Sequence, residues 1–457
     1  MQIALAKPKI KLIFFFSMIV IFSSVSLMAT NAAFLFTDTI YNGVNIGNVP
    51  VGGLSVDEAK DALRIAFEEK KNQSMITIEY EKNTWSIMPQ DIELSIDIDE
   101  LAIQAHNVGR GGNIIKILQE RYITANGGYT LPFTYSYNHD KLYNVIAAIA
   151  QSVDKDPQNA LLLYQNKIIE IKPEVLGQKV DIPLTLDGIT NELATKMQFT
   201  SKLIVNQQYP TITSRDFADI DSLLAVYTTE FDPNKKSRYQ NVAIASEHID
   251  NRLVHSGEVF SFNQDVGLRL PEYGYKEAPV FVDGKLTLDW GGGVCQVSTT
   301  LYNAVLLADM DIEERASHFE PPGYVPMGQD ATVADNLIDF KFKNVSSHSI
   351  YIKSEISNNQ ITISIFGKNV LNPPEIRIES DSKTLEYNTI IKQDSSLPVG
   401  KEIVESVGQK GFAVTTYRIK LVNGKEISRE RLSSDEFKPE DRIIRVGTKA
   451  QPQKITK

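Results

Sequence analysis

Cysteine is nearly absent from this chain, which has one, Cys295, in 457 residues. A single cysteine cannot form a disulfide bridge within its own chain, so the sequence excludes a disulfide-stapled scaffold. Zinc sites are built from several cysteine and histidine ligands at short spacings, and the six histidines here are scattered. We therefore expect no metal site and no cofactor.

Positive charge is also scarce relative to negative charge. The chain carries 47 lysines and arginines against 57 aspartates and glutamates, which gives a net charge of −10. This balance argues against general nucleic-acid binding, so we expect no nucleic-acid partner. The length is enough for about three domains of roughly 150 residues each.

Long apolar runs are missing except near the N-terminus. Lys7, Lys9 and Lys11 precede an uncharged stretch over residues 12–37, which can supply the roughly 20 apolar residues that cross a membrane. We predict that residues 1–37 form a single-pass anchor in the cell membrane. The lysines favour the cytoplasmic side, so the bulk of the chain is expected outside the cytoplasm. A cleaved signal peptide, which would leave a secreted protein, is the alternative.

Residues 38–215 are predicted to form an α+β module with an internal duplication. Three short strands followed by a helix occur at residues 75–106 and again at residues 160–193. Ser55 and Glu58 have the spacing of a capping box, which predicts a helix that begins directly after Ser55.

Two further domains follow. Residues 225–360 mix helical and strand patterns and are predicted to be α+β, whereas residues 374–449 alternate like strands and are predicted to be a small all-β domain. Within the latter, Asn423-Gly424 between two alternating runs predicts a two-residue hairpin turn. Residues 450–457 are expected to be a frayed tail. The fold class is therefore α+β multidomain.

Cys295 follows three glycines and falls in the first turn of a predicted helix. Backbone N–H groups are unpaired there and the helix dipole is positive, which stabilises a thiolate, the reactive form of cysteine. Val294, Val297 and Leu301 form one apolar stripe, and Cys295 lies beside it. The periodicity therefore does not force the thiol into the core, although an inert buried cysteine is the alternative.

A cysteine nucleophile needs a base, and His318 is our candidate. It lies 23 residues after Cys295, a distance that suits a helix followed by a returning strand. Asp330, in a turn-rich loop, or Gln296, beside the cysteine, could orient the imidazole. The other histidines of this region have no supporting pattern around them.

Residues 231–355 resemble the VanW family. The matching segments are Phe260–Asn263, Gly274-Tyr275, Gly291–Ala304, Arg315–His318 and Tyr324–Val333. One departure is His255-Ser256-Gly257-Glu258, where the family usually has Pro-Gly-Glu; it changes turn chemistry and leaves the site untouched.

The flanking regions resemble other modules of cell-wall proteins. Residues 75–205 are similar to a duplicated module proposed to bind peptidoglycan, and residues 375–449 are similar to a β domain named for five glycines. The five matching glycines are Gly400, Gly408, Gly411, Gly424 and Gly447. The resemblance implies that peptidoglycan, both its stem peptides and its glycan, is the partner, besides the membrane at the N-terminal helix. The oligomeric state is left open.

Some VanW domains are linked to L,D-transpeptidase activity with a catalytic cysteine, and that role carries over to Cys295. The resemblance then implies that Cys295 forms a thioester with a stem peptide and passes the acyl group to an amine, which cross-links the wall. Water in place of the amine would make a carboxypeptidase. The alternative is a non-catalytic peptidoglycan-binding scaffold, or an accessory protein linked to glycopeptide resistance.

The expected site has three parts. The catalytic group is Cys295, His318, Asp330 and Gln296. Backbone N–H groups at the helix start, around Gly293 and Val294, are the expected oxyanion donors. Side chains expected to bind substrate are Ser298, Thr299, Arg315 and Tyr324.

Overall fold

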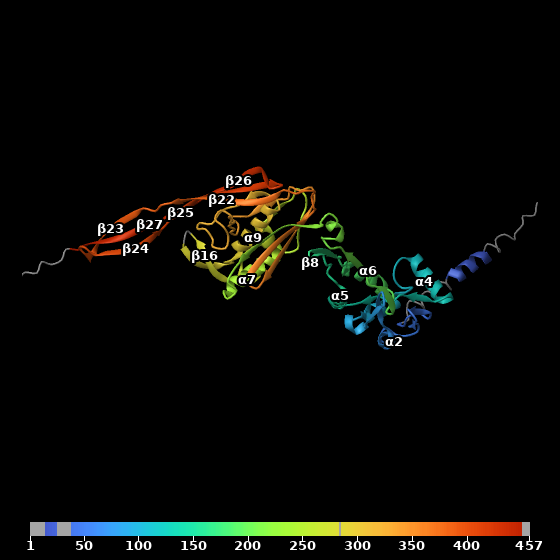
Figure 1. The fold of residues 1–457 in the computed structure, drawn as a ribbon. Coiled ribbons are helices and arrows are strands. Elements are labelled where there is room, and N and C mark those ends of the chain that lie inside the picture. Colours follow the sequence, from blue (N-terminus) through green and yellow to red (C-terminus); the bar gives the residue numbers. More distant parts are fainter. Residues whose placement is uncertain (1–13, 25–37, 283–284, 450–457) are drawn as a thin grey trace, which may run out of the picture. The chain divides into compact units, whose positions relative to one another are not determined.

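The computed structural model describes residues 14–24, 38–282 and 285–449. These residues form two compact units, each of which is treated separately below. The first runs to Pro157 and resumes over Leu176–Tyr209; the second takes Gln158–Val175 and the chain from Pro210 onward. The secondary structure is mixed α+β and ends in an all-β region, as predicted (Figure 1).

The first unit packs helices against small sheets. Its helices are α2 (Val56–Gln73), α3 (Ile98–Asn107), α4 (Ile114–Asn126), α5 (His139–Val153) and α6 (Ile182–Leu193), with the 3-10 turn η1 (Pro89–Ile92). Its strands are β1 (Val44–Ile46), β2 (Val49–Pro50), β3 (Ile76–Tyr80), β4 (Asn83–Ile87), β5 (Ser95–Ile96), β6 (Tyr129–Leu131), β7 (Tyr135–Ser136), β10 (Gly177–Val180), β11 (Phe199–Lys202) and β12 (Val205–Gln208). They pair as β2-β1-β6, β11-β3-β4, β10-β12 and β5-β7.

Two local predictions are confirmed in this unit. The Ser55 hydroxyl accepts from the Glu58 amide and the Glu58 carboxylate accepts from the Ser55 amide, so α2 begins with the expected capping box. The strand–strand–strand–helix order occurs twice, as β3-β4-β5-α3 and as β8-β9-β10-α6. The hairpin of β8 (Leu161–Gln165) and β9 (Ile168–Lys172) belongs to the second unit, however, so the second repeat is divided between the units.

The second unit begins its main sheet at β13 (Ser222–Glu230), which pairs in the order β13-β21-β20-β14. The other strands of this sheet are β14 (Arg252–Val254), β20 (Ile350–Ser357) and β21 (Gln360–Gly367). A second sheet has the order β15-β19-β18, from β15 (Val259–Ser261), β18 (Asp311–Glu314) and β19 (Lys341–Lys343). The strands β16 (Glu277–Val282) and β17 (Lys285–Trp290) form a hairpin.

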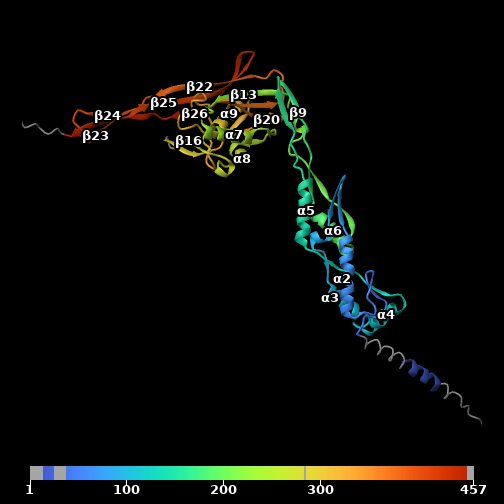
Figure 2. The same cartoon turned by 90° about the horizontal axis from the view of Figure 1, so that it is seen from below.

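Helices α7 (Lys236–Ile249) and α9 (Val294–Leu307) pack on the main sheet, α9 against β13 and β21 and α7 against β20 (Figure 2). The remaining short helices are α8 (Phe262–Val266), η2 (Ser214–Phe217) and η3 (Pro271–Tyr273). Val297, Leu301 and Val305 of α9 are fully buried, so this helix is the centre of the unit's hydrophobic core.

The sequence predicted one buried apolar stripe on α9, but the helix is buried on more of its faces than that. Polar residues on the other faces, including Gln296, Ser298, Thr299 and Asn303, are also buried. Ser298, Thr299 and Asn303 are hydrogen-bonded to the chain at 329–331, and Gln296 is hydrogen-bonded to β13 and to Arg238 of α7. Each of these four side chains makes at least one hydrogen bond, as the burial of polar groups requires, and Oδ1 of Asn303 is the atom among them left without a partner in the described residues.

The last 75 residues described are all strand and turn, as predicted. Two three-stranded sheets have the orders β22-β25-β26 and β23-β27-β24. The strands are β22 (Glu375–Leu385), β23 (Thr389–Pro398), β24 (Glu402–Gln409), β25 (Gly411–Val422), β26 (Lys425–Phe437) and β27 (Glu440–Lys449). The turn between β25 and β26 has Asn423 and Gly424 both at positive φ, which confirms the predicted hairpin.

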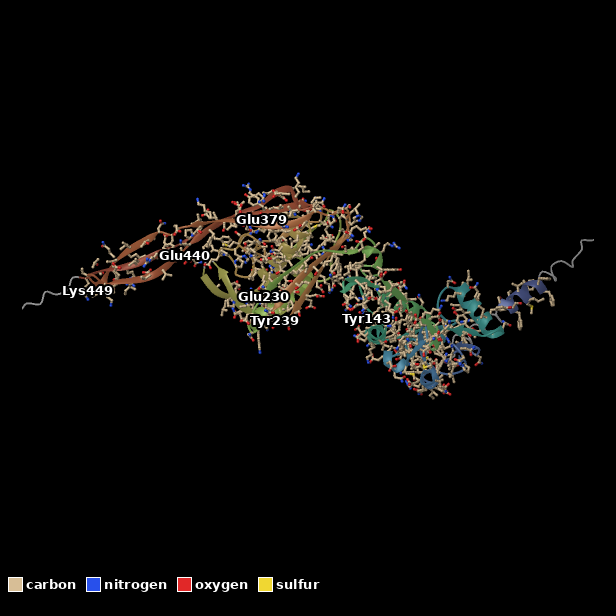
Figure 3. All side chains as sticks on the ribbon, viewed as in Figure 1. Tyr143, Glu230, Tyr239, Glu379, Glu440 and Lys449 are labelled. Carbon is tan, nitrogen blue, oxygen red and sulfur yellow. The ribbon has the colours of Figure 1, made fainter. Side chains whose placement is uncertain are left out.

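The two C-terminal sheets differ in burial. The β22-β25-β26 sheet lies beside α9 in Figures 1 and 2, and Val414 and Thr416 of β25 are buried. The β23-β27-β24 sheet has mostly exposed side chains, and Glu440 and Lys449, at the two ends of β27, are labelled in Figure 3. The first sheet is therefore part of the unit's packing and the second extends from it.

The predicted membrane anchor is not shown. Residues 14–24 are helical, but no helix within the described ranges is both long enough and apolar enough to span a membrane. The rest of the segment 1–37 lies almost entirely outside the described residues, as does the expected tail at 450–457. The anchor stays a prediction.

Replacing Leu301 of α9 by alanine should destabilise the second unit, because the Leu301 side chain is fully buried in the hydrophobic core. We expect the free energy of unfolding to fall by about 2–5 kcal/mol. The chain has two tryptophans, so in a Trp85→Phe background the fluorescence of Trp290 follows this unit during urea denaturation. Leu337→Ala is the control, since Leu337 is 85% exposed. Equal effects of the two substitutions would contradict the central place of α9.

Candidate active site

The three glycines before Cys295 let the chain turn tightly into α9. Gly291 and Gly293 have φ of +76° and +114°, where a side chain is strained. A Cβ at Gly292 would lie 2.7 Å from the carbonyl oxygen of Ala278 on β16. The turn therefore needs glycine both for its backbone angles and for its close approach to the neighbouring hairpin.

The thiol of Cys295 lies at the start of α9 and is partly exposed. Its sulfur donates to the carbonyl oxygen of Val333 at 3.4 Å, and His318 lies close enough for its charge to act on the thiol. The expectation that Cys295 stands beside the apolar stripe and near His318 agrees with this geometry.

His318 follows β18 and is fixed at both its backbone and its ring. Its amide and its Nδ1 each lie 2.6 Å from Oδ2 of Asp330. Because Nδ1 is engaged by the carboxylate, Nε2 is the nitrogen left to face the sulfur of Cys295. The ring is 20% exposed at its side chain, so the imidazole lies at the edge of the core and not within it.

Asp330 is completely buried and has two cationic partners. One oxygen contacts His318, and the other accepts from Arg315 at 3.0 Å. The Arg315 Nε also donates to the Asp330 carbonyl oxygen at 2.6 Å. A buried carboxylate is tolerated when its oxygens are satisfied in this way.

The polar face of α9 holds the segment that carries Asp330. Ser298 Oγ donates to the Ala331 carbonyl at 2.6 Å, and Thr299 Oγ1 accepts from the Ala331 amide at 3.0 Å. One turn later, Asn303 donates to the Gln329 carbonyl at 2.7 Å. The helix that presents the thiol thus also fixes the backbone on either side of the carboxylate.

The three side chains shift one another's pKa values. Burial lowers the pKa of His318, but its hydrogen bonds to Asp330 and Cys295 and their negative charges outweigh burial and raise it to about 9. Burial raises the pKa of Cys295, but the hydrogen bond and charge of His318 outweigh it, so the thiol pKa is lowered. Burial also raises the pKa of Asp330, but its hydrogen bonds to His318 and the charges of Arg315 and His318 outweigh burial and lower it. The arrangement favours a thiolate–imidazolium pair.

The expected oxyanion donors need a correction. The Val294 amide donates to the Gly291 carbonyl and the Gln296 amide to the Gly293 carbonyl, both at 3.0 Å. Neither is free to bind a substrate oxygen. Within the described part of the chain, the amides of Gly293 and Cys295 have no backbone acceptor, so Gly293 stays a predicted donor and the Cys295 amide is available beside it.

Gln296 is not placed to orient His318. Its side chain is fully buried and bonds elsewhere, accepting from Arg238 at 2.9 Å and donating to Thr229 Oγ1 and the Glu230 carbonyl. It ties α9 to β13 and α7. Of the two candidates for orienting the imidazole, the structure puts Asp330 against the ring.

Three of the four expected substrate-binding residues are structural. Ser298 and Thr299 are 0% exposed and bonded to Ala331, and the Arg315 side chain is 6% exposed and bonded to Asp330. These residues lie behind the site and hold it, so they cannot contact a substrate. The sequence motif that contains them does not show which residues hold the site in place and which bind substrate.

Tyr324 does belong to the rim of the site. It is partly exposed, and burial together with the charge of Cys295 raises its pKa. Two cations nearby were missed from the sequence. Arg269 lowers the pKa of Cys295 by its charge. Arg238, at the start of α7, contacts Gln296, and its charge opposes part of the rise in the pKa of Tyr324.

Arg238 and Arg269 differ in their partners. Arg269 is buried and paired with Asp335. Arg238 is partly exposed and has no acidic partner among the described residues. A single arginine carries no sequence pattern, so its contact with Gln296 at the start of α9 is apparent only in the fold.

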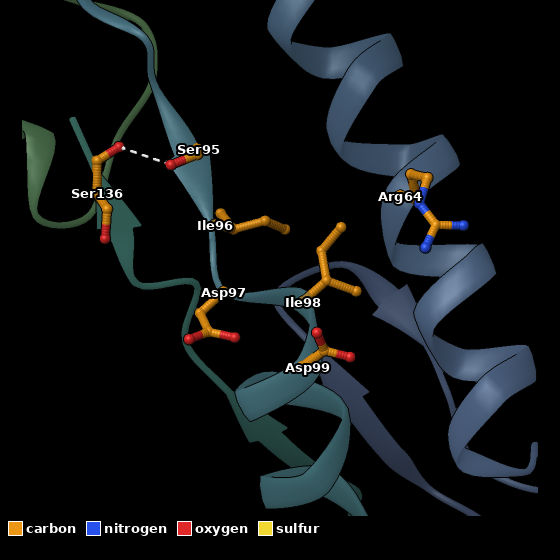
Figure 4. Close-up of a pocket in the computed structure, with 7 residues that line it drawn as sticks. All are labelled: Arg64, Ser95, Ile96, Asp97, Ile98, Asp99 and Ser136. Carbon is orange, nitrogen blue, oxygen red and sulfur yellow. Dashed lines mark hydrogen bonds between the residues drawn. The ribbon is translucent and has the colours of Figure 1, made fainter. Parts of the chain in front are cut away.

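A separate cavity of about 480 Å³ lies in the first unit, lined by Arg64, Ser95, Ile96, Asp97, Ile98, Asp99 and Ser136 (Figure 4). Asp97 caps α3 and Asp99 is paired with Lys60, so both acids have structural roles. The cavity is lined by no cysteine or histidine and is distinct from the Cys295 site.

Comparison with known proteins gives three matching family models. A model described as "VanW like protein" matches residues 237–366, one described as "Putative peptidoglycan binding domain" matches residues 85–201, and one described as "G5 domain" matches residues 377–449. All three resemblances seen in the motifs are confirmed.

Two curated relatives are similar over much of the chain. The uncharacterized protein YoaR of Bacillus subtilis (strain 168) is 36% identical over 245 residues, which is 53% of this chain and 79% of that protein. The vancomycin B-type resistance protein VanW of Enterococcus faecalis (strain ATCC 700802 / V583) is 29% identical over 154 residues, which is 32% of this chain and 56% of that protein.

Solved structures match the C-terminal region. An IgA1 protease G5 domain is 34% identical, covers 17% of this chain and 95% of that one, and has a TM-score of 0.16. The G5 domain of HP0197 is 27% identical, covers 16% and 97%, and has a TM-score of 0.13.

The pH dependence of thiol alkylation tests the ion pair. Because the pKa of Cys295 is lowered by His318, iodoacetamide should alkylate the native chain with a midpoint below the usual thiol value of about 8.5. In His318→Gln the main interaction that opposes burial is lost, so the midpoint should rise. Each unit of this rise slows alkylation at pH 7 by about tenfold. His255→Gln, in an exposed turn, is the control; a shared midpoint for all three proteins would refute the pairing.

Proposed function

Because the chain belongs to the family of VanW-like proteins, we propose that it is a cell-wall protein whose VanW domain transfers acyl groups of peptidoglycan stem peptides through Cys295. Its VanW, peptidoglycan-binding and G5 matches are those of an extracytoplasmic, wall-associated protein. The observation that carries the catalytic part is the place of His318, whose Nδ1 is held by the buried Asp330 and whose charge acts on the Cys295 thiol.

The first half-reaction forms a thioester. The Cys295 thiolate attacks the carbonyl carbon of the third residue of a tetrapeptide stem, and the Cys295 amide donates to the developing oxyanion. The imidazolium of His318 then protonates the departing nitrogen, the C–N bond breaks, and D-alanine leaves. Asp330 holds the ring in the tautomer and orientation that this proton transfer needs.

The second half-reaction releases the enzyme. The side-chain amine of a neighbouring stem attacks the thioester carbonyl, neutral His318 takes the amine proton, and the C–S bond breaks to give a new amide and the thiolate. With water in place of the amine, the product is a carboxylic acid and the reaction is that of a carboxypeptidase. The same residues serve both outcomes.

Substrate recognition follows from the charges around the thiol. A stem peptide carries carboxylates, and Arg238 is a partly exposed cation without an acidic partner among the described residues. A guanidinium binds a carboxylate by two parallel hydrogen bonds. We assign Arg238 to a substrate carboxylate and Tyr324 to the wall of the peptide channel.

A second candidate function is a peptidoglycan-binding scaffold, or an accessory protein in glycopeptide resistance, without catalysis. The comparisons favour it, because one matching model is described as a binding domain, none as an enzyme, and one relative is a vancomycin resistance protein. In this case residues 85–201 and 377–449 would hold the wall polymer and the Cys295 site would be vestigial.

Mass spectrometry of the intact chain separates the two functions. With tetrapeptide muropeptides, the catalytic function predicts an adduct on Cys295 equal to the donor minus D-alanine, and free D-alanine in solution. Cys295→Ala should abolish both, while binding to insoluble peptidoglycan stays unchanged. If no adduct or D-alanine forms and both proteins bind the polymer equally, the chain is a scaffold.

Arg238→Gln should weaken substrate binding more than catalysis, since Arg238 contacts the start of α9 and lies outside the proton-transfer chain. We expect a rise in KM of about tenfold or more, from the loss of one charge-assisted hydrogen bond, with kcat changed much less. Lys236→Gln, an exposed neighbour on α7, is the matched control. An unchanged KM, or a loss confined to kcat, would remove Arg238 from the substrate site.

A further inference from the structure

We infer that the C-terminal β domain completes the Cys295 site, with Asp435 on β26 acting as a positioning residue for His318 through Arg315 and Asp330. The inference rests on the proposed function only for its consequence in catalysis. Its structural basis is a continuous chain of contacts from one domain into the other, within the second unit.

Arg315 is the link between the two domains. Its NH1 nitrogen donates to Asp435 Oδ1 at 2.6 Å, its NH2 nitrogen donates to Asp330 Oδ1 at 3.0 Å, and its Nε donates to the Asp330 carbonyl. The Arg315 and Asp435 side chains are only 6% and 9% exposed. A guanidinium that is bonded at three nitrogens and removed from water has little freedom to move. The orientation of Asp330 therefore depends on the bond of Arg315 to Asp435 as well as on its bonds to Asp330.

Other contacts hold the same two surfaces together. Thr416 of β25 donates to the Gly328 carbonyl at 3.2 Å, two residues before Asp330. A Cβ at Gly328 would lie 2.3 Å from Thr416 Oγ1, so the loop and the strand meet without room for a side chain. Arg418, which is 3% exposed, donates to the Met310 carbonyl at 2.6 Å. The loop that carries Asp330 is therefore clamped from the C-terminal domain.

The charges around the imidazole give the direction of the effect. His318 faces Cys295 and Asp330; Arg315 faces Asp330, Asp435 and the ring of Tyr302. While Asp435 neutralises Arg315, the Asp330 carboxylate can act fully on the imidazolium. Without the Asp435 charge, the positive charge of Arg315 offsets more of the negative charge of Asp330, so Asp330 stabilises the imidazolium less.

The experiment titrates His318 in the full chain by NMR of 13Cε1-labelled histidine, with the signal assigned by its loss in His318→Gln. Asp435→Asn keeps the shape and an acceptor oxygen but removes the charge. We expect the pKa of His318 to fall by roughly one unit, the order of effect that the loss of one nearby unit charge has at an effective dielectric of about 20. Asp435→Ala should lower it at least as much.

Glu430→Gln is the matched control. Glu430 lies on the same strand and pairs with Arg418 in the same interface, but it does not touch Arg315. The His318 titration should be unchanged in this variant. Thermal unfolding of each variant, followed by circular dichroism, shows whether the domain still folds. If Asp435→Ala does not fold, Asp435→Asn is the variant that tests the inference.

The outcomes are separable. An unshifted His318 titration in folded Asp435→Asn overturns the inference, as does an equal shift in Glu430→Gln, which would reflect general docking of the domains. A shift confined to the Asp435 variants supports it. If that shift occurs but no thioester forms with muropeptides, the positioning role stands and the acyl-transfer function fails.

Discussion

A single buried carboxylate, that of Asp330, organises the candidate site. It has no exposed surface, so its charge is sustainable only because His318 and Arg315 both contact it. This requirement couples three separate segments: the end of β18, the loop before Ala331 and, through Arg315, the strand β26. The acid does not act on substrate itself. Its effect reaches Cys295 through the imidazole, which it keeps oriented and positively charged.

Helix α9 has two tasks that place opposite demands on its residues. Its apolar positions, such as Val297 and Leu301, fill the core beneath the main sheet, while Ser298, Thr299 and Asn303 bond the backbone that carries Asp330. A helix buried on several faces usually pays for polar residues in stability. Here each of them satisfies a backbone group of the adjoining segment, so the same contacts that preserve the core also set the distance between thiol and acid.

The domain arrangement gives this site a second kind of dependence. The C-terminal sheet β22-β25-β26 packs on the VanW domain through polar residues with little exposed surface, including Thr416 and Arg418. Such interfaces are sensitive to the loss of one partner, because the other is left buried and unpaired. A domain whose relatives are G5 domains is thus, in this chain, also a structural part of the neighbouring site. In the same unit, the sheet β23-β27-β24 has mostly exposed side chains and leaves room for contacts with other molecules.

What the sequence determined by itself was local or contained in motifs. The capping box at Ser55, the Asn423-Gly424 turn, the all-β C-terminal region and the placement of Cys295 in the first turn of a helix all follow from residues close together in the chain. The choice of His318 and Asp330 rested on spacing and on the VanW motif. The tertiary structure decided the rest: Gln296 faces α7 and β13, the Val294 amide is already bonded, Arg315 supports the site from behind, and Arg238 stands beside it. Each of these depends on contacts between segments far apart in sequence, and a pattern of residue types cannot encode which of its polar groups will be buried and which will face a substrate.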